Sequence, residues 1–597
     1  MKSHSVKPLV AACALALAST PALALDYGDP GWSSLSPQIQ QQILQIDQIN
    51  AQINGYVSPG YRKYLQAQKT SGNTSGTTPK TVSAPVPAAS TPAPSTASAP
   101  PPSVPGGTCA SLGLNLEGIS YYSASMPFID LMKASSGWTH PGGSAYSKVP
   151  IPEDQYGDPL SLASDKFLVN YVSFFQWEPT VPSAQHPSQS YVMTWDGNGL
   201  VTPSQAKVIS NDFHRVVFQV TGMRFFIDLT STDANDPVRN VRIVPLSMEG
   251  TTQVFDPAYL NSIRNFHTFR FMDWNQTNDS TIQHWSQRTT PQAVTQAVGG
   301  VAYEYMIQLA NMTSSDLWVN VPLLADNNYI QQMAQLFHSQ LNPGRTVYVE
   351  YSNEVWNSGT FTQYNQLKPI AQANGLSGPA MVWQQYSARV AQIASIWHQV
   401  FNSGNGPKVK VLMAGQLANP WILMQELAYN NNGHKVDGAT AAFYVGGYEL
   451  LNAQNEASFR NDTPEQLDEA ILNQALPLQV TRVQQNLAIV KPYNLPFYFY
   501  EGGQSLQAAG HEPDGMPMNK DATIVNLEQQ ANHLPLMTTV YEKILSAWKA
   551  SGVGLFMLYD STAPDSQYGY WGLREYEYTP LNQAPKLQGV YDFCGWK

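Results

Sequence analysis

Hydrophobic residues follow two alternating patterns along the chain from position 108 onward. Short runs rich in β-branched and aromatic residues, typical of buried strands, alternate with stretches in which apolar residues recur every three or four positions, as in amphipathic helices. Repeated strand-then-helix units predict parallel strands, and eight of them fit a closed (β/α)8 TIM barrel of the α/β class. The predicted strands are 114–122, 268–274, 317–322, 346–352, 409–414, 439–445, 496–501 and 554–559, and the helices between them include 329–341, 383–401, 464–490 and 536–550.

An open, doubly wound sheet is the main alternative to the barrel. No Gly-rich phosphate-binding motif follows any of the predicted strands, which disfavours a nucleotide-binding form of that fold.

The interval between the first two predicted strands is too long for an ordinary loop. Within it, the segments 190–194, 215–221, 223–228 and 241–245 alternate apolar and polar residues, with turn residues at 196–199 and 233–237. This pattern predicts a small antiparallel β subdomain at about 164–250, inserted after the first barrel strand.

Three segments precede the barrel. Residues 1–24 have a basic start, an apolar run and Ala22-Leu23-Ala24, the pattern of a signal peptide, although Cys13 also permits a lipoprotein interpretation. Residues 25–68 contain an amphipathic helix that either forms a short self-associating coil or packs on the main domain. Residues 69–107 form a Pro/Ser/Thr/Ala-rich linker, which leaves 108–597 as the barrel domain.

Charge and composition narrow the range of partners. Charged residues make up 13 % of the 597 residues, against a usual value of about 25 %, and the formal net charge is −11. The chain has no basic clusters for nucleic acid, and the apolar run of the leader is too short for a membrane span. With 14 Trp, 31 Tyr and 21 Phe, the composition suits uncharged, ring-shaped ligands. We therefore expect an exported protein, periplasmic or extracellular, without membrane insertion.

Two cysteines remain once the leader is set aside, Cys109 and Cys594, at the two ends of the predicted barrel domain. In an oxidising compartment we expect them to form a disulfide bond, which requires those ends to be neighbours in space. Two unrelated buried thiols are the alternative.

The strand at 346–352 is followed by the first candidate catalytic group. Period-two alternation directs Tyr348, Glu350, Ser352 and Glu354 toward the barrel axis. Glu354 then lies at the C-terminal mouth, where barrel enzymes carry their catalytic groups. Glu350 lies deeper and needs a buried partner, for which we expect Arg270.

A second glutamate ends the seventh predicted strand, in the sequence Phe499-Tyr500-Glu501-Gly502-Gly503. Strands four and seven lie on opposite sides of an eight-stranded mouth, so Glu354 and Glu501 should face each other across it. Two facing carboxyl groups are what hydrolysis of a glycosidic bond requires, one to protonate the leaving oxygen and one to attack or to activate water.

Asn353-Glu354 after the fourth strand together with Glu501 after the seventh resembles clan A glycoside hydrolases, the (β/α)8 group that includes cellulases and mannanases. The resemblance implies that Glu354 is the general acid/base, Glu501 the nucleophile and Asn353 a hydrogen-bond donor to the sugar. It also implies a retaining mechanism, with carboxyl groups about 5 to 5.5 Å apart.

Arg270 resembles the second-strand arginine that supports the nucleophile in several clan members. This role and the expected pairing with Glu350 are alternatives for the same guanidinium. Tyr444 resembles the sixth-strand aromatic residue that hydrogen-bonds the nucleophile. Asp273, with Asn275 and Asn278, is a candidate for binding sugar hydroxyls. The candidate aromatic sugar platforms near strand ends are Trp274, Trp356, Trp421 and Trp571.

The histidines are scattered without metal-ligand spacing, and no Ser occupies a nucleophile elbow, so we expect neither a metal nor another cofactor. The sequence favours an exported retaining β-glycoside hydrolase acting on a polysaccharide or oligosaccharide. A non-catalytic carbohydrate-binding or extracellular-matrix protein on a barrel scaffold is the alternative.

Overall fold

The computed structural model describes residues 109–140, 151–162, 167–173, 190–222, 224–402, 406–453, 455–511 and 515–597. The predicted signal peptide, N-terminal helix and linker lie outside these residues.

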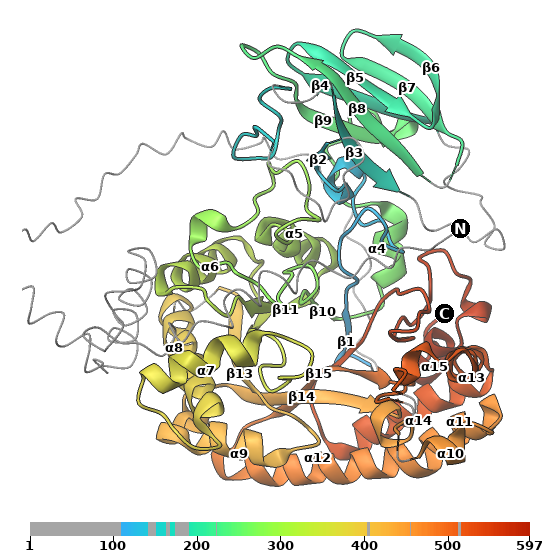
Figure 1. Cartoon of the computed structure of the whole chain (residues 1–597). Helices are drawn as coiled ribbons and strands as arrows, with labels where there is room; N and C mark the ends of the chain where they lie inside the picture. Colours follow the sequence, from blue (N-terminus) through green and yellow to red (C-terminus); the bar gives the residue numbers. More distant parts are fainter. Residues whose placement is uncertain are drawn as a thin grey trace, which may run out of the picture.

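Eight parallel strands form a closed barrel in the order in which they occur along the chain (Figure 1). This confirms the predicted fold and excludes the open sheet. The first predicted run was placed too late, because its strand ends at Asn115 and the chain turns away after it. The barrel strands are β1 (Leu112–Asn115), β10 (Thr268–Arg270), β11 (Asp316–Val321), β12 (Thr346–Tyr351), β13 (Lys408–Ala414), β14 (Gly438–Val445), β15 (Phe497–Gln504) and β16 (Phe556–Leu558).

Helices surround the barrel and bury their apolar faces against it (Figure 1). Asp326 caps the first of the predicted helices, and a capping box joins Thr463 and Gln466 at the start of the third. That third helix contains a π turn at Ile471–Ala475. The longer helices are α5 (Tyr303–Thr313), α6 (Asn327–Gln340), α7 (Gln363–Ala373), α8 (Met381–Val400), α9 (Pro420–Ala428), α11 (Pro464–Ala470), α12 (Leu476–Val490), α13 (Ala522–His533), α14 (Leu536–Ser551) and α15 (Pro585–Cys594).

The predicted β insertion is confirmed as two four-stranded antiparallel sheets with a hydrophobic core of their own. They lie at the top of Figure 1, beyond α4 (Pro257–Ile263) and α5. One sheet has the order β2 (Trp138–Thr139), β3 (Leu168–Ser173), β8 (Arg224–Thr232), β5 (Gly199–Ser204), and the other β6 (Ala206–Asp212), β7 (Arg215–Val220), β4 (Ser190–Asp196), β9 (Arg239–Pro245).

The loop that follows β10 contacts the segment that leads into the insertion. Lys133 Nζ donates hydrogen bonds to the carbonyl oxygens of Pro291 and Ala293, at 3.1 and 2.7 Å. Phe128 and Phe255, which precede and follow the insertion in the chain, pack against each other in the barrel core, with ring centroids 5.7 Å apart. A polar clamp and an aromatic contact therefore hold the insertion next to the barrel.

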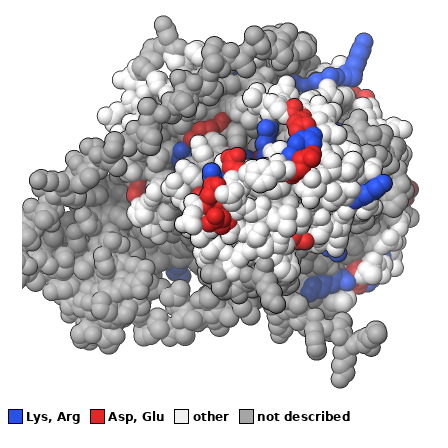
Figure 2. Space-filling model, turned by 90° about the horizontal axis from the view of Figure 1, so that it is seen from above, with Lys and Arg blue, Asp and Glu red and all other residues white. Residues whose placement is uncertain are grey.

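Cys109 and Cys594 form the predicted disulfide bond, with their Cα atoms 5.5 Å apart. Cys109 precedes β1 and Cys594 ends α15, so the bond joins the first barrel strand to the last helix. Seen from above, the described surface is largely uncharged, with Lys, Arg, Asp and Glu in small groups (Figure 2). Among the described residues, no helix is long and apolar enough to span a membrane.

Candidate active site

Glu354 reaches the barrel mouth through a turn rather than through strand alternation. Tyr348 and Glu350 point into the barrel as expected, since Tyr348 stacks on Trp318 and the Trp318 indole N–H donates to Glu350 Oε2 at 2.8 Å. β12 then ends at Tyr351. Two residues beyond it adopt left-handed backbone conformations, with φ of 59° at Ser352 and 42° at Glu354. Glu354 thus lies at the mouth as expected, but a left-handed turn and not strand alternation places it there.

Two neighbours hold the Glu354 carboxyl group. The Tyr500 hydroxyl donates to Oε1 at 3.2 Å, and Asn357 Nδ2 donates to Oε2 at 3.0 Å. Burial raises the pKa of Glu354 to about 8, and the negative charge of Glu501 acts in the same direction against these two hydrogen bonds. Burial therefore favours the protonated form of Glu354.

A bulge in β15 brings two consecutive residues into the barrel. The register with β14 passes from Phe499 opposite Ala441 to Glu501 opposite Ala442, so Tyr500 has no partner of its own. As a result, both the Tyr500 hydroxyl and the Glu501 carboxylate point into the mouth. β15 also runs on to Gln504 instead of ending at Glu501.

Glu501 accepts hydrogen bonds from two predicted partners. Arg270 Nη1 donates to Oε1 at 2.6 Å, and the Tyr444 hydroxyl donates to Oε2 at 3.0 Å. The Glu501 side chain is 6 % exposed. A guanidinium and a hydroxyl donor therefore fix the position of this carboxyl group from two sides.

Arg270 contacts both Glu350 and Glu501, the two carboxyl groups that the sequence offered as alternative partners. Its Nε and Nη2 donate to Glu350 Oε2 at 3.1 and 2.8 Å, while Nη1 donates to Glu501. Burial acts to lower the pKa of Arg270, but the charges of Glu350 and Glu501 outweigh burial and raise it. Burial raises the pKa of Glu350, opposed by Arg270. One buried cation thus lies between two carboxyl groups.

Two asparagines complete the contacts of Arg270. Nη1 donates to Asn115 Oδ1 at 3.0 Å, and Nη2 donates to Asn353 Oδ1 at 2.9 Å. Asn353 Nδ2 in turn donates to Asn278 Oδ1 at 3.1 Å. Asn353 therefore links Arg270 to Asn278.

Asp273 lies close to Glu501. Burial raises the pKa of Asp273 to about 7, and the charge of Glu501 adds to the increase, whereas Arg270 opposes it. The Tyr559 hydroxyl donates to Asp273 Oδ2 at 3.4 Å. Burial and the charge of Glu501 therefore both favour the protonated form of Asp273.

Trp274 is not a sugar platform. Its side chain is 1 % exposed, and the indole N–H donates to the Glu117 carbonyl at 2.9 Å. The ring packs against Phe128 and Phe271 in the core, because the chain turns inward directly after β10. No face of this indole is left for a ligand.

The other predicted aromatic residues are partly exposed. Trp356 lies next to Tyr500, and Trp571 packs edge-on against Tyr559, with ring centroids 6.0 Å apart. The ring centroids of Tyr559 and Tyr444 lie 6.2 Å apart. The rings of Trp571, Tyr559 and Tyr444 form an aromatic wall that ends at Glu501, to which the Tyr444 hydroxyl donates. Trp421 instead packs on Trp383 of α8, and Asn275 donates to the Asn320 carbonyl.

Sequence reasoning missed four residues that the structure brings to the site, namely Asn115, Asn357, Tyr500 and Tyr559. Asn115 ends β1 and Tyr559 follows β16, so their strand-end positions were a usable signal. Tyr500 had no such signal, because the bulge that directs it inward leaves no mark in the alternation.

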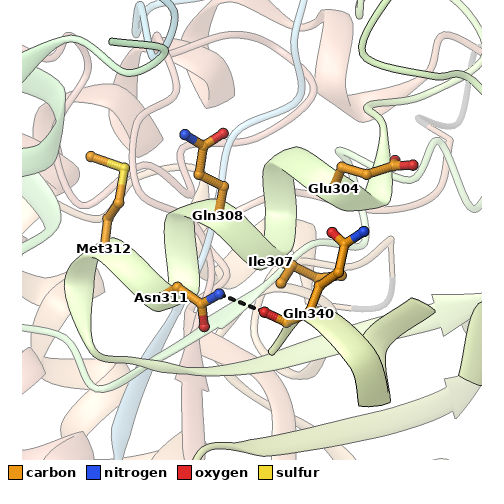
Figure 3. Close-up of a pocket in the computed structure, with 6 residues that line it drawn as sticks. All are labelled: Glu304, Ile307, Gln308, Asn311, Met312 and Gln340. Atoms are coloured by element: carbon orange, nitrogen blue, oxygen red, sulfur yellow. Dashed lines mark hydrogen bonds between the residues drawn. The ribbon is translucent and has the colours of Figure 1, made fainter. Parts of the chain in front are cut away.

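A hollow in the described surface lies elsewhere, between α5 and α6, with a volume of about 450 Å³ (Figure 3). Asn311 Nδ2 donates across it to the Gln340 carbonyl at 2.8 Å. Its one carboxylate is paired with Arg288, and neither Glu354 nor Glu501 lines it, so it is separate from the candidate active site. The lining residues are Glu304, Ile307, Gln308, Asn311, Met312 and Gln340.

No protein-family model and no curated protein matches the chain. Among solved structures, it is similar to the catalytic core of a xylanase A, at 11 % identity and a TM-score of 0.33 over 57 % of this chain and 92 % of that one. It is also similar to a GH5 xyloglucan-specific endo-β-1,4-glucanase from a metagenomic library, at 9 % identity and a TM-score of 0.30 over 59 % of this chain and 90 % of that one. A β-glucosidase from Thermotoga maritima matches at 9 % identity and a TM-score of 0.30 over 57 % of this chain and 86 % of that one. All three are glycosidases. The strand order defines the barrel fold, and the contacts described above define the candidate site.

Proposed function

We propose that this chain is an exported retaining β-glycoside hydrolase that cleaves a polysaccharide or oligosaccharide. The observation that carries the proposal is the contrast between two neighbouring carboxyl groups. Glu501 accepts hydrogen bonds from Arg270 and Tyr444, whereas burial and the charge of Glu501 raise the pKa of Glu354 to about 8. A carboxyl group held by a cation and a hydroxyl donor, beside a second one whose burial favours the protonated form, suits the nucleophile and the acid of a double displacement.

In the first step, Glu501 attacks the anomeric carbon while the Glu354 carboxyl group transfers its proton to the departing glycosidic oxygen. The C–O bond to the leaving group breaks, and an ester forms between Glu501 and the sugar. Esterification removes the negative charge of Glu501, which is one cause of the raised pKa of Glu354. The pKa of Glu354 therefore falls at the point where this residue must act as a base.

In the second step, the Glu354 carboxylate takes a proton from water, and the water oxygen displaces Glu501 from the anomeric carbon. The product keeps its anomeric configuration, and both carboxyl groups return to their starting states. We assign Asn353 and Asp273 to the sugar hydroxyls, and Trp356 and Trp571 to the apolar ring faces. Export is consistent with the leader pattern and with the disulfide bond.

The test is hydrolysis of a β-glucan, mannan and xylan panel, with the product anomer followed by NMR. We expect Glu501→Gln and Glu354→Gln to abolish cleavage of natural substrates while glycan binding persists. Glu304→Gln, on the outer surface of α5, is the control and should cleave normally. A wild-type chain that binds glycans and cleaves none of them would favour the binding-protein alternative.

The two glutamates are distinguished by an aryl glycoside whose leaving group needs no proton. Glu354→Ala should still form the glycosyl-enzyme with this substrate, and added azide should restore turnover with a β-glycosyl azide as product. Glu501→Ala should not form that intermediate. The opposite pattern would exchange the two roles.

A further inference from the structure

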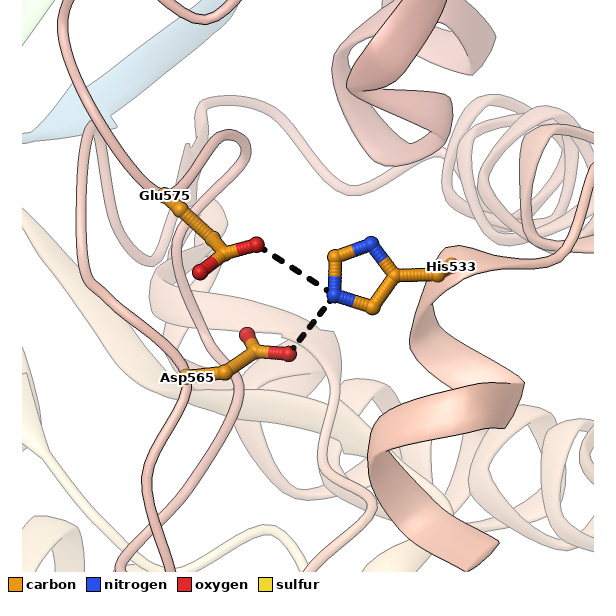
Figure 4. Close-up of side chains that lie close together, drawn as sticks. All are labelled: His533, Asp565 and Glu575. Atoms are coloured by element: carbon orange, nitrogen blue, oxygen red, sulfur yellow. Dashed lines mark hydrogen bonds and ion pairs between the residues drawn. The ribbon is translucent and has the colours of Figure 1, made fainter. Parts of the chain in front are cut away.

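Three side chains far apart in the sequence converge on one point near the C-terminal side of the barrel (Figure 4). His533 is the last residue of α13, whereas Asp565 and Glu575 belong to the segment between β16 and α15. The Asp565 side chain is 3 % exposed, Glu575 is 30 % exposed and His533 is 44 % exposed. The group is thus reachable from solvent, with a buried carboxylate at its base.

Both carboxylates approach the same imidazole nitrogen. His533 Nε2 lies 3.0 Å from Asp565 Oδ2 and 3.3 Å from Glu575 Oε1, and the potential ligand atoms of the three residues all lie within 4.8 Å of one another. A single N–H at Nε2 donates well to one acceptor and not to two. A metal ion, in contrast, can bind the imidazole nitrogen and both carboxylate oxygens at once.

Two of the three separations between ligand atoms, those from His533 Nε2, fit such a metal ion. With metal–nitrogen and metal–oxygen bonds of about 2.0 to 2.2 Å, neighbouring ligands in tetrahedral and octahedral sites lie about 3.0 to 3.4 Å apart. One imidazole with two carboxylates is also a ligand set that divalent transition metals take. The distances of 3.0 and 3.3 Å fall within that range.

The local charge leaves room for a cation. Lys586 lies near Asp565 and Glu575, and its Nζ donates a hydrogen bond to the Tyr570 carbonyl. This lysine balances one of the two carboxylates. A bound metal ion would complement the two carboxylates, which face this single lysine.

We propose that His533 Nε2, Asp565 Oδ2 and Glu575 Oε1 bind a divalent transition-metal ion, with water completing its coordination. The sequence did not suggest this site, because its ligands lie 32 and 10 residues apart and match no ligand motif. The site is separate from Glu354 and Glu501, and it does not depend on the proposed hydrolysis.

The position of the ion defines what it would do. Asp565 and Glu575 flank Trp571, whose carbonyl accepts a hydrogen bond from the Asp560 N–H at 3.1 Å. Trp571 also packs against Tyr559 in the aromatic wall. A metal bound to both carboxylates and to α13 would fasten this segment to the helix layer and keep the wall in place.

The test measures binding of Zn²⁺ to the metal-stripped full chain by calorimetry and elemental analysis, with Mn²⁺ and Ca²⁺ in parallel. We expect one Zn²⁺ per chain and a higher Tm when Zn²⁺ is present. His533→Ala and Asp565→Asn should each weaken binding at least tenfold and remove the Tm increase. His398→Ala is the matched control, because His398 pairs with Asp437 alone and is 40 % exposed.

Binding that persists in both His533→Ala and Asp565→Asn would overturn the proposal, as would the absence of Zn²⁺ and Mn²⁺ binding by the wild-type chain. Should Ca²⁺ alone bind, the assignment to a transition metal would be wrong. A loss of binding in His398→Ala equal to that in His533→Ala would show that the effect is not specific to this cluster. Each of these readouts is independent of glycan hydrolysis.

Discussion

Arg270 Nη1 donates a hydrogen bond of 2.6 Å to Glu501 Oε1, and both side chains are almost completely buried. The same guanidinium binds Glu350, which lies deeper in the barrel and is fully buried. An interior salt bridge and the support of the proposed nucleophile are therefore one structure. The planar, five-donor geometry of arginine is what permits one side chain to satisfy both carboxylates.

Arg270→Lys should weaken both the salt bridge to Glu350 and the support of Glu501. A lysine ammonium retains the charge but cannot span Glu350 and Glu501, so Glu501 loses its orientation and a buried carboxylate loses a partner. We expect kcat/KM to fall by at least about 100-fold and the free energy of unfolding to fall by about 3 kcal/mol. Kinetics on the cleaved glycan and urea unfolding measure the two effects.

Arg288→Lys is the control for this substitution, because Arg288 pairs with Glu304 in a partly exposed position. It should change the free energy of unfolding by less than about 1 kcal/mol and leave kcat/KM unchanged. Wild-type kcat/KM in Arg270→Lys would contradict the role assigned to Arg270.

The Tyr500 hydroxyl should set the upper pH limit of activity. The proposed acid Glu354 must be protonated, so kcat/KM of the wild type should fall as pH rises through about 8, the pKa of Glu354. The hydrogen bond from Tyr500 stabilises the charged form of Glu354 and lowers its pKa. Tyr500→Phe removes that stabilisation, which should move the alkaline limb of the pH–rate profile to higher pH.

Tyr498→Phe serves as the comparison on the same strand, since the Tyr498 hydroxyl accepts from Lys410 Nζ at 2.9 Å and not from the site. Its alkaline limb should coincide with that of the wild type. A limb that moves to lower pH in Tyr500→Phe would mean that the hydroxyl stabilises the protonated form of Glu354 instead.

The sequence was sufficient for the barrel because each strand is a compact run of apolar residues, and the six residues of β12 are all buried. Asn353-Glu354 and Glu501 were predictable for the same reason, since each lies at or near a strand end. Cys109 and Cys594 could be paired because no third cysteine follows the leader.

What the sequence could not show depends on backbone irregularity and on contacts between distant segments. The bulge at Tyr500 and the left-handed turn at Glu354 both break the period of two on which the alternation argument relied. Trp274 resembled a surface platform because its burial depends on Phe128 and Phe255, which come from other segments. The bond of Arg270 to two acids likewise requires three strands to meet.

Removing the disulfide bond should lower stability without removing activity. Cys109 and Cys594 are 485 residues apart, and Cys109 lies at the N-terminal end of β1, away from the mouth. Their bond restricts the unfolded chain, so the double variant Cys109→Ser/Cys594→Ser should lose about 2 to 5 kcal/mol of unfolding free energy. Thermal unfolding with and without reductant measures this. Reductant should lower the Tm of the wild type and leave that of the double variant unchanged; an equal decrease in both would contradict the prediction.

Stability itself should decrease between pH 5 and pH 8. Burial raises the pKa of Glu577 from 4.5 to about 8, and its Oε2 accepts a hydrogen bond from the Met126 N–H at 2.8 Å. Between those two pH values the folded chain binds more protons than the unfolded chain, so increasing pH favours unfolding. The contribution of this one group is at most about 1.4 kcal/mol per pH unit.

Glu577→Gln keeps an acceptor for Met126 and cannot ionise, so its unfolding free energy should depend less on pH than that of the wild type. Glu117, whose pKa burial also raises to about 8, keeps part of the slope in the variant. Urea unfolding at pH 5, 6, 7 and 8 gives both slopes, with Glu304→Gln on the surface of α5 as the control. Because a protonated Glu577 and a glutamine are nearly isosteric, the two chains should converge at pH 5 and differ most at pH 8, where the variant is the more stable. A slope in Glu577→Gln equal to that of the wild type would contradict the raised pKa of Glu577.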